Sequence, residues 1–205
     1  MRTTVIALAG SPTSGKSSVL RALKELDQSE NIKVLFLDEM ATVFLHNRPE
    51  EVSALDSQLL RQHYILRGQI YSEELLLNNA VDPVKPTLII TDRGSVDAMV
   101  YLEDDEFLKL KVDPETLYSR YDHVIFLEGS RENFRYDPTT TRLESNYDEI
   151  SARGERSYTV WSKHPSFSLI TQQDTVEMKI KLVVDRINEL MRINVFNNVK
   201  IAEKK

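Results

Sequence analysis

Eight residues near the amino terminus, GSPTSGKS at 10–17, have the types and spacing that bind phosphate. They match G-x-x-x-x-G-K-[ST], a pattern whose glycines let successive backbone N–H groups converge on one anion at the start of a helix. We expect Lys16 to reach the β- and γ-phosphates of a nucleoside triphosphate and the Ser17 hydroxyl to bind Mg²⁺. The residues expected to bind the nucleotide are Gly10, Ser11, Thr13, Ser14, Gly15, Lys16, Ser17 and Ser18.

Two apolar runs, KVLFL and TLIIT, each end in charged residues that could act on the bound phosphate. In a kinase-like strand order the third strand lies beside the first, so we expect Asp92 to hold the metal ion. Asp38 and Glu39 then face the phosphate acceptor, where a carboxylate can take the proton of an attacking hydroxyl. Arg93 would stabilise phosphate charge or orient that base. The alternatives are a helix-capping role for Asp38 and Glu39 and a structural ion pair at Asp92 and Arg93.

A polar face on a long helical stretch is the candidate acceptor site. Gln62, Gln69 and Glu73 are seven and four residues apart and therefore share one side of a helix. Gln62 and Gln69 could bind the base or sugar of an acceptor. The alternative is a face that is simply solvated.

Arginines that follow the fourth apolar run could form a lid over the transferring phosphates. A planar guanidinium suits the charge spread over phosphate oxygens, and we favour Arg131, Arg135 and Arg142 over the other arginines of this segment. We expect Asp97 to act as a cap or buttress, and Trp161 and His164 to pack the lid region onto the core.

Five short apolar runs predict the buried strands that would position these residues. Helical patterns alternate with them, and one of these begins at Asp113–Pro114 and another behind Asp174 or Thr175. This alternation predicts an α/β fold, a three-layer sandwich around a five-stranded parallel sheet in the order 2-3-1-4-5, with a helical lid. The expected strands are residues 4–9, 33–37, 87–91, 123–127 and 167–170, and the expected helical segments are 15–26, 50–79, 113–121 and 174–191.

The expected domain organisation is a single P-loop NTPase or kinase-like domain over residues 1–192. Its lid covers about 129–164, and a C-terminal tail follows at 193–205.

Composition limits the classes of partner. The chain of 205 residues has 26 basic and 32 acidic side chains, a net charge of −6, and no cysteine. The acidic balance argues against a nucleic-acid partner, and the lack of cysteine excludes disulfides and cysteine-based metal sites. No apolar run has the roughly 18 residues of a spanning helix, so we expect no membrane partner and a cytoplasmic protein.

Several motifs resemble the AAA-type P-loop family that includes the kinase domain of NadR and the P-loop domain of the TRPL translocation defect protein. The similarity covers about residues 3–192. It implies a bound ATP or GTP with Mg²⁺ and a functional glutamate at Glu39, because Asp38 stands where the family pattern has proline. The motifs are GSPTSGKS, DEMAT, DRGSVDAMVYLE, RYDHVIFLE, WSKHPSFSLI and VEMKIKLVVDRI.

Two functions fit these features. The first is a Mg²⁺-dependent, ATP-binding kinase that phosphorylates a hydroxyl of a small, nucleoside-like molecule. The second is an ATP- or GTP-dependent switch with slow hydrolysis and a protein partner. A guanine-reading motif would need a lysine that TQQD at 171–174 lacks, which favours ATP while leaving GTP possible. The sequence leaves the acceptor and the oligomeric state open.

Overall fold

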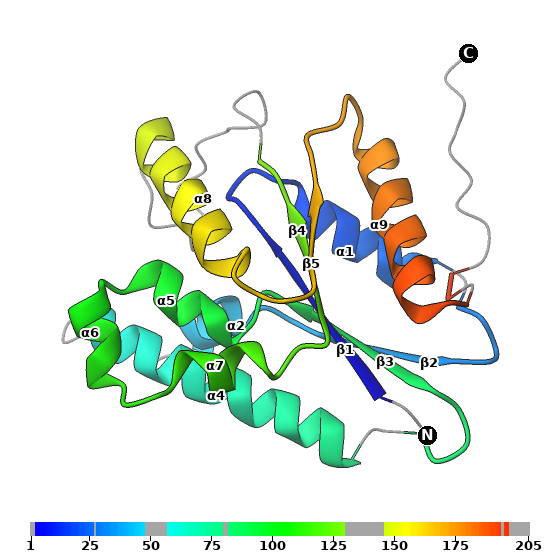
Figure 1. The fold of residues 1–205 in the computed structure, drawn as a ribbon, viewed down its shortest axis with the longest axis horizontal. Helices are drawn as coiled ribbons and strands as arrows, with labels where there is room; N and C mark the ends of the chain where they lie inside the picture. Colours follow the sequence, from blue (N-terminus) through cyan, green and yellow to red (C-terminus); the bar gives the residue numbers. More distant parts are fainter. Residues whose placement is uncertain are drawn as a thin grey trace.

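The computed structural model describes residues 3–26, 28–47, 57–79, 82–129, 146–193 and 195–196. Its centre is a five-stranded sheet in which every pairing is parallel (Figure 1). The order β2-β3-β1-β4-β5 confirms the predicted sheet. The strands are β1 (Thr3–Gly10), β2 (Lys33–Leu37), β3 (Thr87–Asp92), β4 (His123–Leu127) and β5 (Phe167–Ile170).

Helices cover both faces of this sheet and complete the predicted three layers (Figure 1). One face packs against α1 (Lys16–Glu25) and α9 (Val176–Met191). The other packs against α4 (Gln58–Asn79), α5 (Ala98–Tyr101), α6 (Asp104–Lys109), α7 (Pro114–Tyr118) and α8 (Tyr147–Trp161). The remaining helices are α2 (Met40–Asn47), which lies against α4, and the 3₁₀ turn η1 (Ser95–Asp97).

Alternate strand residues divide the apolar core into two halves. Ala7 and Phe126 are buried on the side of α4 and α8, whereas Leu8 and Leu127 are buried on the side of α1 and α9. Strands buried on both faces explain why their sequences are nearly continuous apolar runs.

Helix starts follow the capping chemistry expected from sequence. The Asp113 side chain accepts a hydrogen bond from Thr116 N, and Pro114 is the first residue of α7. Thr175, rather than Asp174, caps α9 by accepting from Met178 N at 3.2 Å.

Some expectations fall partly outside the described residues. These are the start of the long helical stretch at 50–56, most of the expected tail, and the lid segment 130–145. Within the described part of the chain, no helix is long and apolar enough to cross a membrane.

Candidate active site

The phosphate loop joins β1 to α1 at the carboxyl edge of the sheet. Its turn is closed by Ser14 N donating to Ser11 O, and Ser11 N donates to Leu127 O of β4. Gly10 has no room for a side chain, because a Cβ there would lie 2.8 Å from Leu127 O. Gly15 has a φ of 78°, a conformation that glycine adopts without strain. The loop therefore presents the first N–H groups of α1 to the edge where β1 and β3 end.

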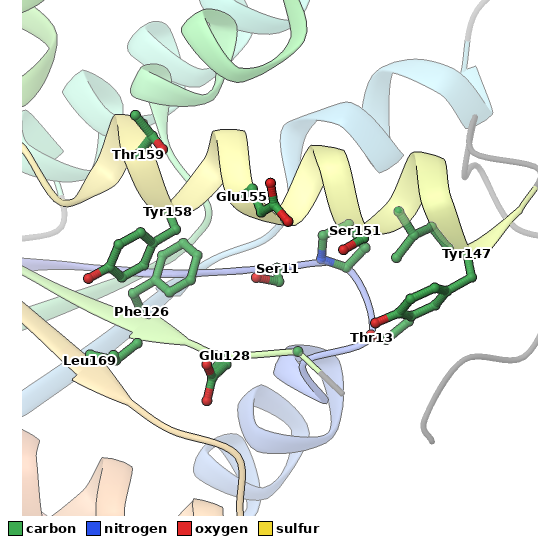
Figure 2. A pocket seen from close by; sticks show the side chains of 14 residues that line it. Ser11, Thr13, Phe126, Glu128, Tyr147, Ser151, Glu155, Tyr158, Thr159 and Leu169 are labelled. Atoms are coloured by element: carbon green, nitrogen blue, oxygen red, sulfur yellow. The ribbon is translucent and has the colours of Figure 1, made fainter. Parts of the chain in front are cut away.

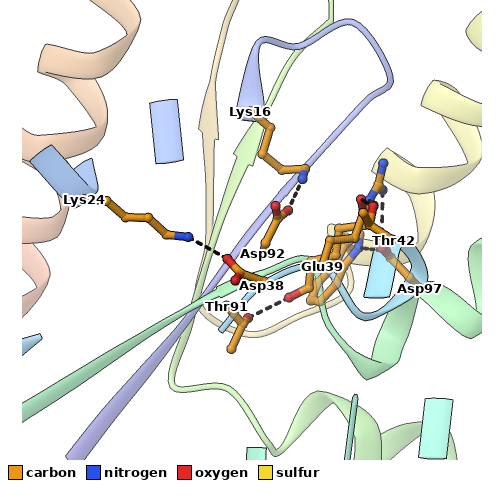
Figure 3. Close-up of polar contacts among 10 residues, drawn as sticks. Lys16, Lys24, Asp38, Glu39, Thr42, Thr91, Asp92 and Asp97 are labelled. Carbon is orange, nitrogen blue, oxygen red and sulfur yellow. Dashed lines mark hydrogen bonds and ion pairs between the residues drawn. The ribbon is translucent and has the colours of Figure 1, made fainter. Parts of the chain in front are cut away.

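Lys16 forms a buried ion pair with Asp92, the last residue of β3 (Figure 3). β3 lies directly beside β1, with Asp92 in register with Leu8, so the carboxylate lies next to the phosphate loop. This is the neighbourhood expected for a metal-side acid.

Arg93, which directly follows Asp92 at the end of β3, binds Glu39, which lies just after β2. Its Nε donates to Glu39 Oε1 at 2.5 Å, and its Nη1 donates to Asp97 Oδ2 at 3.3 Å. Asp97 in turn accepts from Trp161 Nε1 at 2.7 Å, so it buttresses Arg93. Thr42 Oγ1 donates to the other oxygen of Glu39 at 2.6 Å. The backbone O of Glu39 also accepts from Val43 N in α2. Glu39 therefore contributes both to the start of α2 and to the candidate site.

The charge state of this cluster depends on burial and on neighbouring charges. Burial raises the pKa of Glu39, but the charges of Arg93 and Lys16 and hydrogen bonds from Thr42 and Arg93 outweigh burial and lower the pKa to about 2. Burial raises the pKa of Asp97, and the nearby Arg93 and the Trp161 hydrogen bond oppose that rise. Glu39 is therefore ionised at neutral pH.

Asp38 and Glu39 diverge, although they are adjacent in sequence. Asp38 is 74% exposed and pairs with Lys24 of α1 at 2.5 Å (Figure 3). Only Glu39 approaches Arg93. The spacing in the sequence allowed either carboxylate to be the functional one, and in the structure Glu39 alone of the two belongs to the cluster around Arg93.

The polar face of α4, formed by Gln62, Gln69 and Glu73, is buried. The alternative of a solvated face is therefore wrong. Gln69 donates to Glu73 Oε1 at 2.8 Å, and the Tyr121 hydroxyl donates to the same oxygen at 2.6 Å. Arg120 pairs with the other oxygen of Glu73. The Gln69 amide is therefore engaged inside the protein, between α4 and the start of β4. Gln62 is 5% exposed, and its side chain makes no hydrogen bond to the residues that the structure describes.

The favoured lid arginines, Arg131, Arg135 and Arg142, lie outside the described residues. The two arginines of α8 bind backbone carbonyls of α5. Arg153 Nη1 donates to Val100 O at 2.7 Å, and Arg156 Nε donates to Met99 O at 3.2 Å. Trp161 and His164 are buried as expected, and His164 Nε2 lies 2.9 Å from Tyr121 O.

Lys179 is a residue near the site that the sequence interpretation missed. Lys179 is buried in α9 on the face that carries Val183 and Ile187, whereas Val176 at the start of the helix is exposed. Lys179 Nζ donates to Ser14 O and Glu128 O, each at 3.0 Å, and to Gln172 Oε1 at 3.1 Å. The only sign in the sequence that Lys179 is buried is its position, at helical spacing, among the apolar residues of this helix.

The oxygen ligands available for Mg²⁺ are few. The described residues contain no group of three or more His, Cys, Asp or Glu side chains that could hold a metal ion. This suits Mg²⁺ in a phosphate site, because the ion there keeps several waters and takes one or two protein oxygens plus phosphate oxygens. The oxygens that would fit such a site belong to Ser17, exposed at the start of α1, and to Asp92 beside Lys16.

The phosphate loop and the sheet order define the chain as a P-loop NTPase with a kinase-like architecture. A family model described as an AAA domain matches residues 5–179, so the chain belongs to that AAA-domain family. None of the curated proteins matches the sequence.

Solved structures of similar fold include three proteins, each 14% identical to this chain. Deoxyadenosine kinase from M. mycoides with bound dATP has a TM-score of 0.58, with 90% of this chain and 100% of that chain covered. Thymidylate kinase from Candida albicans has a TM-score of 0.59, with 96% of both chains covered. NadR in complex with NAD and AMP-PNP has a TM-score of 0.60, with 96% of this chain covered, and this chain spans 51% of NadR. At this identity the similarity shows the fold.

Proposed function

We propose that this protein is a Mg²⁺-dependent kinase that transfers the γ-phosphate of ATP to a hydroxyl of a small, nucleoside-like molecule. The observation that carries the proposal is the Glu39–Arg93 pair beside the Lys16–Asp92 pair. A phosphate-binding lysine and a metal-side acid thus lie close to a carboxylate held by an arginine. Phosphoryl transfer needs this combination, because it depends on positioning and on charge stabilisation.

Lys16, Arg93 and the N–H groups of the loop would act on the phosphate. Lys16 would exchange Asp92 for the β- and γ-phosphate oxygens when the nucleotide binds. Arg93, which Asp97 and Trp161 hold in place, would stabilise charge on the transferring group. Ser17 and Asp92 would hold Mg²⁺, which supplies charge neutralisation at the phosphates.

Glu39 would accept the proton of the acceptor hydroxyl. A pKa of about 2 keeps it ionised but makes it a weak base while Arg93 is bound. Phosphate bound to Arg93 would share its positive charge with Glu39, and the basicity of Glu39 would rise. The same contact would therefore couple nucleotide binding to activation of the acceptor.

Gln62 is the stronger of the two proposed acceptor-binding residues. It is buried on the inner face of α4 and makes no hydrogen bond within the described chain, whereas Gln69 is bound to Glu73. Its amide atoms are not among the fully buried, unpaired side-chain atoms of the described residues, so they keep contact with solvent and are open to a polar ligand group. We also propose a cytoplasmic location, which suits a chain without cysteine.

The first test is phosphate transfer by the purified protein with Mg²⁺, ATP or GTP, and a panel of nucleosides. Release of nucleoside diphosphate that one acceptor stimulates strongly, together with a phosphorylated product, is the expected result. Release that no acceptor changes would replace the kinase proposal with the nucleotide-dependent switch.

Two variants that remove the same charge then test the base. Glu39→Gln should lower transfer by about 10²- to 10⁴-fold while nucleotide affinity is retained, because a general base contributes on that order. Asp38→Asn is the matched control and should keep near wild-type transfer, since Asp38 is exposed and bound to Lys24. Unchanged turnover in Glu39→Gln would exclude the proton-acceptor role.

A further inference from the structure

A hollow of about 590 Å³ lies between α8 and the β4–β5 side of the sheet (Figure 2). Phe126 and Leu169 line it from the strands, and Tyr158 and Glu155 line it from α8. Ser11 and its neighbours in the first half of the phosphate loop line one end. Its volume is within the range of pockets that hold small molecules.

This hollow adjoins the candidate active site at Ser11 and Thr13 of the phosphate loop, but it lies outside the charged pairs of that site. Phe126 belongs to the half of the core on the α8 side, whereas its neighbour Leu127 belongs to the half beneath α1 and α9. α1, which begins at Lys16, therefore lies on the opposite face of the sheet from the hollow. Neither Lys16 nor the Glu39–Arg93 pair lines it.

The interior of the hollow is aromatic. The rings of Phe126 and Tyr158 meet edge to face with centroids 5.7 Å apart. Tyr158 remains 44% exposed and Leu169 remains 39% exposed, although both lie in a concave surface. A flat apolar group placed here would remove that surface from water.

The charged side chains among the described lining residues are both negative. Glu155 on α8 and Glu128, which directly follows β4, lie on opposite sides of the hollow (Figure 2), and the described lining residues include no lysine or arginine. Gln172 N donates to Glu128 at 2.9 Å, but no hydrogen bond or ion pair joins Glu155 to the described residues. A neutral ligand would desolvate Glu155 without pairing it, and an anion would be repelled.

We propose that this hollow is a binding site for a small organic cation with a flat aromatic body. The body covers Leu169 and part of Tyr158, and the positive charge pairs with Glu155 and with the exposed ring of Tyr158. The site does not depend on the kinase proposal, because it shares none of the charged residues on which that proposal rests.

The test compares two probes of the same shape. Phenyltrimethylammonium and its neutral isostere tert-butylbenzene are titrated into the full chain, and binding is followed by saturation-transfer NMR. We expect saturable binding of the cation that is at least about tenfold tighter than that of the neutral probe. Equal affinity for the two probes, or no binding of the cation, would overturn the proposal.

Three variants locate the binding. Glu155→Gln should weaken the cation about tenfold while leaving the neutral probe unchanged. Ser151→Phe, from a lining position on α8, should fill the hollow and abolish binding of both probes. Glu25→Gln removes an exposed carboxylate from α1 and should bind like the wild type. Unchanged cation binding in Glu155→Gln would contradict the assignment even if Ser151→Phe failed to fold.

Discussion

Two basic residues, Arg93 and Lys16, determine the charge of Glu39. Burial alone would favour the protonated acid, yet the two positive charges and the hydrogen bond from Thr42 keep it ionised. Arg93 itself is held from its other end by Asp97 and, through Asp97, by Trp161. The geometry of the proposed base is thus set by residues from α2, from the turn that follows β3 and from α8.

The lowered pKa of Glu39 predicts a dependence of stability on pH. Its ordinary pKa of 4.5 applies to the unfolded chain, and its folded pKa is about 2. Between these values the unfolded state binds more protons, so the free energy of unfolding falls as pH decreases from about 4.5 to about 2, by at most about 1.4 kcal/mol per pH unit for this group. Urea unfolding at several pH values measures the fall.

Glu39→Gln should lose this contribution and show a shallower dependence over that interval. Asp38→Asn, which removes an exposed carboxylate from the same strand end, should keep the wild-type slope. Parallel curves for wild type and Glu39→Gln would show that the pair with Arg93 does not lower the pKa of Glu39.

At the scale of elements, the junction between β3 and η1 is fixed by aromatic side chains. The backbone at Gly94 passes so close to Tyr121 that a Cβ there would lie 2.4 Å from the hydroxyl oxygen, and it would lie 3.0 Å from Trp161. The same hydroxyl accepts from Ser95 N at 2.6 Å. The turn that follows Arg93 is therefore held between α8 and the start of β4.

This packing predicts that Gly94→Ala is destabilising. Both neighbouring rings are buried and cannot move away, so overpacking should lower the free energy of unfolding by about 1–3 kcal/mol, measured by urea denaturation. Gly68→Ala in α4 is the control. Its Cβ would meet only the flexible end of Met40, and alanine is favoured over glycine in a helix by up to about 1 kcal/mol, so the variant should be neutral or more stable. Equal losses from the two variants would contradict this account of the junction.

At the scale of the whole molecule, Lys179 connects three parts of the carboxyl edge. From α9 its ammonium group binds the phosphate loop at Ser14, the end of β4 at Glu128 and the loop after β5 at Gln172. Burial lowers the pKa of Lys179, and the charge of Glu128 opposes that change. The loop that would bind phosphate is thereby attached to the last helix of the fold.

Lys179→Met should remove these contacts and leave the buried carbonyl oxygen of Ser14 and the partly buried one of Glu128 without this donor. We expect a loss on the order of 2–3 kcal/mol in the free energy of unfolding, and weaker nucleotide binding measured by titration calorimetry. Lys181→Met removes an exposed lysine from the same helix, where it pairs with Asp185, and should change stability by less than about 0.5 kcal/mol. Unaltered nucleotide affinity in Lys179→Met would limit its role to stability.

The sequence by itself determined the sheet, the phosphate loop and the approximate places of the charged strand ends. These features are local, because strand burial, loop glycines and helix caps are visible in a few consecutive residues. Sequence also placed Asp92 correctly beside the loop, since the strand order brings β3 next to β1.

Only the tertiary structure gave Asp38 and Glu39 their different partners, assigned Gln69 to a buried network and brought Lys179 to the phosphate loop. Each of these outcomes depends on partners that are distant in the chain. Arg93 lies 54 residues beyond Glu39, Tyr121 lies 48 beyond Glu73, and Lys179 lies 165 beyond Ser14. A polar side chain in the interior must find a partner, and which partner it meets is decided by packing between segments that periodicity and spacing do not relate.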